Sequence, residues 1–174
     1  MAAQKKWGKN GYLKDFKAGQ EKGYVYTGVC WQAAEPERRR LFGRLWAFQS
    51  LSLFSAILPG LFTVEALLNT FYAIIPYVLW LIGDIYLTYL LGRMTLGGNP
   101  MRGYVYERSV ARFAPFAAVP LAGALLTAAG IFLFIAKGGG GEGAGMCLLC
   151  CALQGTGFFL IKKSRCAGIW QRIQ

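Results

Sequence analysis

Four long apolar segments, separated by short polar stretches, dominate the pattern of hydrophobic and polar positions. They cover about residues 45–62, 71–91, 113–136 and 146–161. A helix needs roughly 20 apolar residues, and at least about 17, to cross the hydrocarbon core of a bilayer. The pattern therefore predicts an all-α integral membrane protein with four transmembrane helices, arranged as two hairpins. The fourth segment is short, but the basic pair Lys162-Lys163 that closes it supports it as a span.

The first 40 residues are polar, lysine-rich and dotted with aromatic side chains. We expect residues 1–40 to form a cytoplasmic segment, and residues 41–174 to form the transmembrane domain with a short basic C-terminal tail. Pro36 suits a first helical turn, so a juxtamembrane helix is predicted to begin near it and to run into the first span. The run Tyr24-Val25-Tyr26-Thr27 has the composition of a short strand.

One internal echo is present. The letters Gly-Tyr-Val-Tyr begin at Gly23 and again at Gly103, and each copy precedes acidic and basic residues and a helical hairpin. Duplication of a two-helix unit would explain the echo. Four matching letters are thin evidence, so an independent origin is the alternative.

Basic residues produce the formal charge of +11 and follow the apolar segments in a regular way. Of 19 Lys and Arg residues, ten lie between Lys5 and Arg44, four flank the middle loop, four follow the last apolar segment, and only Lys137 lies elsewhere. They therefore collect at alternate ends of successive segments, as the positive-inside rule requires. We expect a multi-pass protein of the cytoplasmic (plasma) membrane with both termini in the cytoplasm. Because topology explains the charge, nucleic acid is not needed as a partner.

The composition excludes several kinds of chemistry. Histidine is absent, which removes His-based acid–base catalysis and most familiar zinc and haem sites. Cys147 and Cys150 have C-x-x-C spacing, but cysteines in apolar surroundings behave as small hydrophobic side chains. We therefore expect no metal, no cofactor and no catalytic residues. An enzyme that uses Glu107 or Glu37 is least favoured, because facing carboxylates or a metal cluster would be needed.

Asp84 is the most informative polar residue because it lies inside the second apolar segment. A charge near mid-membrane costs at least about 2.5 kcal/mol, so an intramembrane acid is a functional candidate. Asp84 lies nine residues from Arg93, which is about 13 Å along a helix at about 1.5 Å per residue. Gln154 and Ser52 lie at a similar depth, each eight residues from the basic edge of its own segment. These three polar groups are therefore predicted to share one layer.

Two further features extend this layer. Tyr77, Asp84 and Thr88 are spaced seven and four residues apart, which places them on one helical face. Pro120 falls at the same depth and leaves the carbonyl of Phe116 without its helical donor, so a protonated Asp84 is able to donate to that carbonyl or to Gln154. The functional interpretation is a proton or cation site. The alternative, which we favour, is a polar clamp that holds four helices in register.

The third apolar segment is rich in small residues. Ala114, Ala118 and Ala122 follow at steps of four, with Gly123, Thr127 and Gly130 beside them. Small residues let helix backbones approach closely. With Pro115 and Pro120, they predict a kinked helix that packs against protein; a substrate path beside the kink is the less favoured alternative.

The lysines of the N-terminal segment are candidates for contact with lipid or with a partner. They are Lys5, Lys6, Lys9, Lys14 and Lys17, with Lys22 beyond them. Each Lys near an anionic surface contributes about 1 kcal/mol to membrane binding. The segment is suited to anionic headgroups or to a cytoplasmic partner, and a solvated tail without a partner is the alternative.

These observations favour a non-catalytic small membrane protein that is an accessory or structural subunit of a larger membrane assembly. Its partners would be the bilayer and either another membrane protein or further copies of itself. The alternative is a small homo-oligomeric transporter or channel, in which Asp84 is the proton or cation site. Four short helices enclose little space, so this alternative needs two or more copies.

Overall fold

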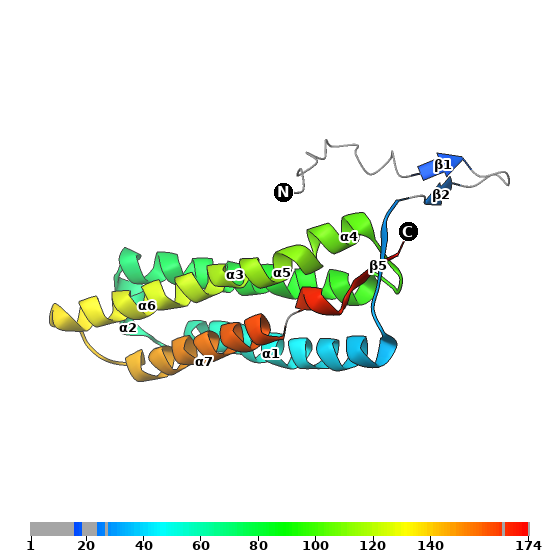
Figure 1. The fold of residues 1–174 in the computed structure, drawn as a ribbon. Coiled ribbons are helices and arrows are strands. Elements are labelled where there is room, and N and C mark those ends of the chain that lie inside the picture. Colours follow the sequence, from blue (N-terminus) through cyan, green and yellow to red (C-terminus); the bar gives the residue numbers. More distant parts are fainter. Residues whose placement is uncertain (1–15, 19–23, 27, 165, 174) are drawn as a thin grey trace, which may run out of the picture.

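The computed structural model describes residues 16–18, 24–26, 28–164 and 166–173, and it consists mainly of helices (Figure 1). The long helices are α1 (Glu35–Leu61), α3 (Phe71–Leu96), α6 (Ala118–Ala136) and α7 (Ala144–Lys163). The shorter helices are α2 (Glu65–Asn69), α4 (Gly103–Arg108), α5 (Val110–Phe116) and the 3₁₀ helix η2 (Cys166–Ile169). The strands are β1 (Phe16–Ala18), β2 (Tyr24–Tyr26), β3 (Cys30–Gln32), β4 (Met101–Arg102) and β5 (Gln171–Ile173).

Four helical segments are long and apolar enough to cross a membrane: α1, α3, the run from α4 to α6, and α7. The four predicted apolar segments therefore correspond to helices of spanning length, as expected of a multi-pass membrane protein. Helix α1 has Pro36 in its first turn, as predicted, and continues through Pro59. Helix α7 has 20 residues, so its two central glycines do not interrupt it.

Helices α3 and α6 approach each other closely because glycines of α6 face the backbone of α3. A Cβ atom added to Gly123 would lie 2.7 Å from the backbone nitrogen of Trp80. A Cβ atom added to Gly130 would lie 2.9 Å from the carbonyl oxygen of Tyr72. Thr127, between the two glycines, is also buried. This is the close packing that small residues permit between membrane helices.

The alanine stripe of the third span does not share in this packing. Ala118 and Ala122 are exposed and Ala114 is only half-buried. One residue along a helix turns the side chain by about 100°, so Ala122 faces away when Gly123 faces α3. The predicted small-residue contact is therefore made by the glycines, and the expectation for the alanines was wrong.

The third span is interrupted, as its prolines predicted. Helix α5 ends at Phe116 and α6 begins at Ala118, with Ala117 at φ −59° and ψ −16° between them. Upstream, Ser109 separates α4 from α5 at φ −122° and ψ −70°. Its hydroxyl donates to the carbonyl of Val105 at 2.6 Å. The run from α4 to α6 is therefore a helical segment with breaks at Ser109 and Ala117.

A small antiparallel sheet lies at one end of the bundle, in the strand order β4-β3-β5 (Figure 1). Trp31 of β3 pairs with Met101 of β4 on one side and with Arg172 of β5 on the other. The all-α prediction is therefore corrected in detail, because three short segments far apart in the chain form a sheet. Strands of two or three residues are too short to show the alternation that sequence patterns reveal. The strand composition at residues 24–27 is confirmed by β2, which pairs with β1.

Side chains fasten this sheet to the helices. Trp31 stacks on Tyr106 of α4, with ring centroids 4.0 Å apart and planes 8° apart. Tyr106 also meets Trp170 edge-on, at 6.2 Å between centroids. Asn99 accepts from the backbone N–H of Ala33 at 3.3 Å and donates to its carbonyl at 2.9 Å. These contacts join the segment before α1 to the loop after α3 and to the C-terminal segment.

The two copies of the Gly-Tyr-Val-Tyr echo have different structures. Residues 24–26 form strand β2, whereas Gly103–Tyr106 form the first turn of helix α4. A duplicated unit would place matching letters in matching elements. The structure therefore does not support a repeat.

Two apolar clusters fill the bundle, one toward each end. Leu45, Leu87 and Ile161 belong to the cluster beside the sheet. Ala56, Trp80 and Cys147 belong to the other, and each of these two clusters draws on α1, α3 and α7. Buried polar residues occupy the level between them on all three helices. The polar layer expected around Asp84 is this level.

Candidate functional site

Asp84 lies on α3 with no exposed surface, and its side chain is directed at polar groups of α1 and α7. Ser52 of α1 donates from Oγ to Asp84 Oδ1 at 2.9 Å. Gln154 of α7 donates from Nε2 to the same oxygen at 3.3 Å. The carboxyl group therefore joins three helices through direct side-chain hydrogen bonds. The residues that take part in this network are referred to as the Asp84 cluster: Gln49, Ser52, Trp80, Asp84, Thr88 and Gln154.

Two members of this cluster were not anticipated from the sequence. Gln49 of α1 donates from Nε2 to Asp84 Oδ1 at 3.4 Å, to the Asp84 carbonyl at 3.1 Å and to Thr88 Oγ1 at 3.3 Å. Trp80 donates from Nε1 to Asp84 Oδ2 at 3.0 Å. Helical spacing was the available signal, because Gln49 precedes Ser52 by three residues and Trp80 precedes Asp84 by four.

Thr88 takes part through the backbone of α3. Its hydroxyl donates to the Asp84 carbonyl at 2.9 Å and accepts from Gln49 Nε2. Asp84, Gln154, Ser52 and Thr88 are thus brought together as the sequence predicted. Both carboxyl oxygens of Asp84 accept at least one hydrogen bond, which offsets part of the cost of burying the group.

Tyr77 does not belong to this layer, although it shares a helical face with Asp84. Its hydroxyl donates to the carbonyl of Ala56 at 2.9 Å, inside the apolar cluster away from the sheet. Seven residues along a helix are about 10 Å of rise, so a shared face does not bring two side chains to the same level. The placement of Tyr77 in the polar layer is therefore corrected.

Pro120 lies beside α3 without joining the polar cluster. A Cβ atom on Gly83 would lie 3.0 Å from its Cδ, so the ring packs against the helix next to Asp84. The hydrogen bonds of the Asp84 side chain go to the cluster members above rather than to the Phe116 carbonyl. Pro120 therefore contributes apolar contact at this level.

The Ser52 hydroxyl faces more acceptor oxygens than it has hydrogen atoms to donate. Its oxygen lies 2.9 Å from Asp84 Oδ1 and 2.5 Å from Gln154 Oε1. A hydroxyl has one hydrogen to donate, and both of these oxygens are acceptors when Asp84 is ionised. A proton on Asp84 would complete a ring in which Asp84 donates to Ser52, Ser52 to Gln154, and Gln154 Nε2 back to Asp84.

Gln49 adds one more acceptor to the same region. Its Oε1 atom is buried and has no hydrogen-bond partner among the residues that the structure describes. With Asp84 Oδ1, Ser52 Oγ and Gln154 Oε1, the cluster offers oxygen atoms from α1, α3 and α7. Hard cations bind oxygen ligands of this kind. The arrangement is thus able to hold a proton or a small cation, or to act as a structural clamp.

The remaining predicted residues lie elsewhere. Lys5, Lys6, Lys9 and Lys14 fall outside the described residues, and Lys17 lies in β1. Cys147, Cys150 and Cys151 are buried with free thiols in the apolar cluster away from the sheet. Over residues 16–18, 24–26, 28–164 and 166–173, no three Cys, Asp or Glu residues are grouped so that they would hold a metal ion.

Comparison with known proteins does not extend this picture. The chain matches no protein-family model, no curated protein and no solved structure. Its function must therefore be argued from its own residues.

Proposed function

We propose that this chain is a non-catalytic, accessory or structural subunit of a larger membrane assembly. One observation carries the proposal: the strongest candidate for chemistry, Asp84, is fully enclosed, and its hydrogen bonds connect α1, α3 and α7. Polar side chains that bond across helices hold membrane bundles together. A carboxyl group used in this way fits a scaffold better than a catalyst.

The distribution of charge supports an orientation in the plasma membrane with both termini cytoplasmic. Within residues 28–164 and 166–173, the Lys and Arg residues other than Lys137 lie in the first part of α1, the last turn of α3, the segment from β4 to α5, the last turn of α7, and β5. Figure 1 shows these parts of the chain toward the end of the bundle that carries the sheet. Glu65 and Glu142 lie at the opposite end, in α2 and in the turn before α7. Basic residues of short loops are retained on the cytoplasmic side.

The sheet end is where a cytoplasmic partner would bind. Strands β4 and β5 are the outer strands of the three-stranded sheet, and β5 is exposed along its length. An outer strand presents backbone N–H and C=O groups that pair readily with a further strand. The partner in this proposal is another membrane protein, or a second copy of this chain.

Affinity purification from native membranes in mild detergent tests the proposal. The expected result is a second protein in stoichiometric amount, identified by mass spectrometry, or a defined homo-oligomer. The matched control is the chain without residues 171–173, which lacks β5. This variant should keep the helical bundle but no longer purify together with its partner. A wild-type chain that purifies as a lone monomer contradicts the proposal.

A second function is favoured by the hydrogen count of the Asp84 cluster. Within the described residues, Ser52 has one hydrogen for two oxygen atoms and the buried Oε1 of Gln49 has no hydrogen-bond partner, so the cluster has acceptors for one further proton or small cation. A homo-oligomeric transporter or channel would use that capacity. In proteoliposomes, Asp84→Asn should then abolish proton- or cation-linked flux, whereas Thr156→Val, at an exposed position of α7, should not. Equal flux in wild type and Asp84→Asn removes this candidate.

A further inference from the structure

One oxygen–oxygen contact of the Asp84 cluster has only one possible source for its hydrogen. Ser52 Oγ lies 2.5 Å from Gln154 Oε1. This separation is within the range of O–H···O bonds, about 2.5–3.0 Å, and below that of N–H···O bonds, about 2.7–3.2 Å. An amide oxygen only accepts. The hydrogen in this contact therefore comes from Ser52, whose hydroxyl has no second hydrogen to give.

The neighbouring contact, between Ser52 and Asp84, then lacks a hydrogen unless the carboxyl group supplies it. Ser52 Oγ lies 2.9 Å from Asp84 Oδ1, which is a hydrogen-bond distance between two oxygen atoms. If Asp84 were ionised, lone pairs of both oxygens would face each other at this separation. A proton on Oδ1 makes Asp84 the donor and Ser52 the acceptor. The contact distances therefore favour a protonated carboxyl group.

The other contacts of the carboxyl group fit the same assignment. Trp80 donates from Nε1 to Oδ2 at 3.0 Å, and Gln154 donates from Nε2 to Oδ1 at 3.3 Å. A protonated carboxyl group has one O–H donor and keeps acceptor capacity on its oxygens. Oδ2 is then the carbonyl oxygen, and Oδ1 is a hydroxyl that accepts from Gln154 and donates to Ser52.

The surroundings of Asp84 supply no positive charge that would stabilise its ionised form. Asp84 has no exposed surface, and a buried carboxylate is stable only when it is paired with a cation. Residues 45–61 of α1, 118–136 of α6 and 144–161 of α7 contain no Lys or Arg. On α1 the nearest basic residue is Arg44, eight residues before Ser52, which is about 12 Å along the helix.

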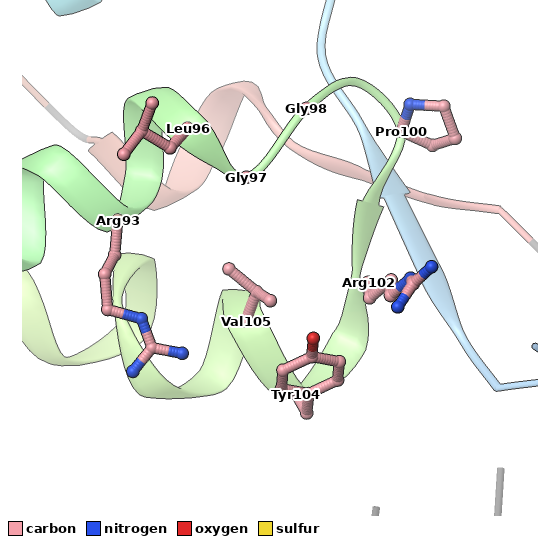
Figure 2. A pocket seen from close by; sticks show the side chains of 8 residues that line it. All are labelled: Arg93, Leu96, Gly97, Gly98, Pro100, Arg102, Tyr104 and Val105. Carbon is pink, nitrogen blue, oxygen red and sulfur yellow. The ribbon is translucent and has the colours of Figure 1, made fainter.

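The nearest basic residue of α3 is Arg93, nine residues beyond Asp84, and it belongs to a different site. Its side chain lines a pocket of about 490 Å³ between the end of α3 and the start of α4 (Figure 2). Its Nη1 atom lies 3.5 Å from the Tyr89 hydroxyl. Arg112, the basic residue of α5, is exposed. Neither arginine is therefore a counter-ion for Asp84.

The ionisable groups closest to Asp84 along the packed helices are phenols and a thiol. Tyr77 and Tyr86 lie on α3, and Cys151 lies on α7, three residues before Gln154. Tyr77 donates to a backbone carbonyl of α1, Tyr86 packs on an aromatic ring of α5, and Cys151 lies in the apolar cluster away from the sheet. Phenols and thiols are neutral or negative, so none of the three offsets a carboxylate.

A metal cation fits this environment less well than a proton. Gln154 and Gln49 both direct amide nitrogens at Asp84 Oδ1, at 3.3 and 3.4 Å, and their hydrogens repel a cation at that oxygen. Gln49 contacts Asp84 through Nε2, whereas its Oε1 atom has no partner among the described residues. A hard cation needs several oxygen ligands around it, and a proton needs only the Asp84 and Ser52 oxygens.

We propose that Asp84 is a proton-binding site: its carboxyl group holds a proton at neutral pH and closes a ring of hydrogen bonds with Ser52 and Gln154. Asp84 donates to Ser52, Ser52 to Gln154, and Gln154 back to Asp84. An aspartate in water titrates near about pH 3.9 and is almost wholly ionised at neutral pH. The proton site requires neither a partner nor flux, so it is independent of both proposed functions.

Infrared spectroscopy of the full chain in neutral detergent tests this site. The C=O stretch of a protonated carboxyl group is separate from the carboxylate bands and shifts in D₂O. Wild type at neutral pH is expected to show this band from one carboxyl group per chain, and Asp84→Asn should lack it. The matched control is Glu142→Gln, at an exposed position before α7, which should keep the band. No band in wild type, or a band that remains in Asp84→Asn, overturns the proposal.

Two further measurements test the ring and the nature of the ligand. Ser52→Ala removes the acceptor of the Asp84 hydrogen, so the band should remain but shift in frequency; an unshifted band overturns the ring. Replacing choline chloride with sodium chloride at constant ionic strength should leave the band unchanged. A band that disappears with sodium shows that a metal cation displaces the proton and overturns the assignment. Purification as a lone monomer, which contradicts the proposed subunit, leaves the spectrum unaffected.

Discussion

Ser52 of α1 and Asp84 of α3 share a hydrogen bond of 2.9 Å, in a part of the bundle where both side chains are buried. Together with the hydrogen bond from Gln154 of α7, this bond connects α1, α3 and α7 at the same depth in the bundle. The packing of the bundle is therefore specified by polar contacts as well as by apolar fit.

Replacing Asp84 with leucine should destabilise the bundle more than replacing it with asparagine. Leucine removes both acceptor oxygens and leaves the donors of Trp80 and Gln154 unpaired, whereas asparagine keeps one acceptor. One unsatisfied buried donor costs about 1–3 kcal/mol. The free energy of unfolding in detergent should therefore fall by at least about 2 kcal/mol for Asp84→Leu. A smaller loss for Asp84→Leu than for Asp84→Asn would contradict the clamp.

Replacing Gly123 with alanine should weaken the contact between α3 and α6. The new Cβ atom would lie 2.7 Å from the Trp80 backbone nitrogen and 2.9 Å from the Pro76 carbonyl oxygen. Overpacking of this kind costs about 1–3 kcal/mol. Gly155→Ala is the matched control, because nothing lies within 4 Å of its added Cβ atom. Since alanine is the better helix former, Gly155→Ala should keep or raise the unfolding temperature; the opposite ranking of the two variants would refute this packing.

Removing the Tyr77 hydroxyl should cost one buried hydrogen bond without disturbing the Asp84 cluster. The Tyr77 hydroxyl bonds to the Ala56 carbonyl at 2.9 Å, and Tyr77→Phe leaves that carbonyl without this donor. The expected loss is about 1 kcal/mol of unfolding free energy. In a double-mutant cycle with Ser52→Ala, the two losses should add. Coupling above about 0.5 kcal/mol would show that the two sites are not independent.

Cys166 should react slowly with thiol reagents at neutral pH. Burial raises the pKa of its thiol to about 12, against an ordinary value of 9.0. Only the thiolate is nucleophilic. At neutral pH, a pKa that is about three units higher lowers the thiolate fraction about a thousandfold. Labelling of the folded chain at pH 7.5, located by peptide mass spectrometry, should therefore modify the half-buried Cys30 well before Cys166. Comparable rates would show that the Cys166 thiol is not buried in the folded chain.

The same pKa also predicts a loss of stability at alkaline pH. The thiol has a higher pKa in the folded chain than in the unfolded one, so the unfolded chain releases its proton first as the pH rises. The stabilising contribution of Cys166 is complete below the ordinary pKa of 9.0 and is lost as the pH rises from there to about 12. In Cys166→Ser the free energy of unfolding should fall less steeply over this pH range. An unchanged slope would show that Cys166 is not the cause of the loss.

The sequence alone was sufficient for the spans and for most of the polar layer. Helices of spanning length are dictated by runs of apolar residues, since backbone groups in hydrocarbon must bond within their own segment. Counting residues from the basic edges placed Ser52, Asp84 and Gln154 at one depth, and their hydrogen bonds agree with this. Depth follows from a constant rise per residue and needs no knowledge of neighbours.

What the tertiary structure decided is which faces meet. Gln49 and Trp80 bond to Asp84, Tyr77 does not, and Gly123 rather than Ala122 faces α3. The three-stranded sheet likewise joins Cys30–Gln32, Met101–Arg102 and Gln171–Ile173. A helix rotates freely about its axis until its neighbours are present, and a strand of three residues gains its hydrogen bonds only from its partners. Both outcomes therefore depend on contacts between segments far apart in the chain, which no local pattern records.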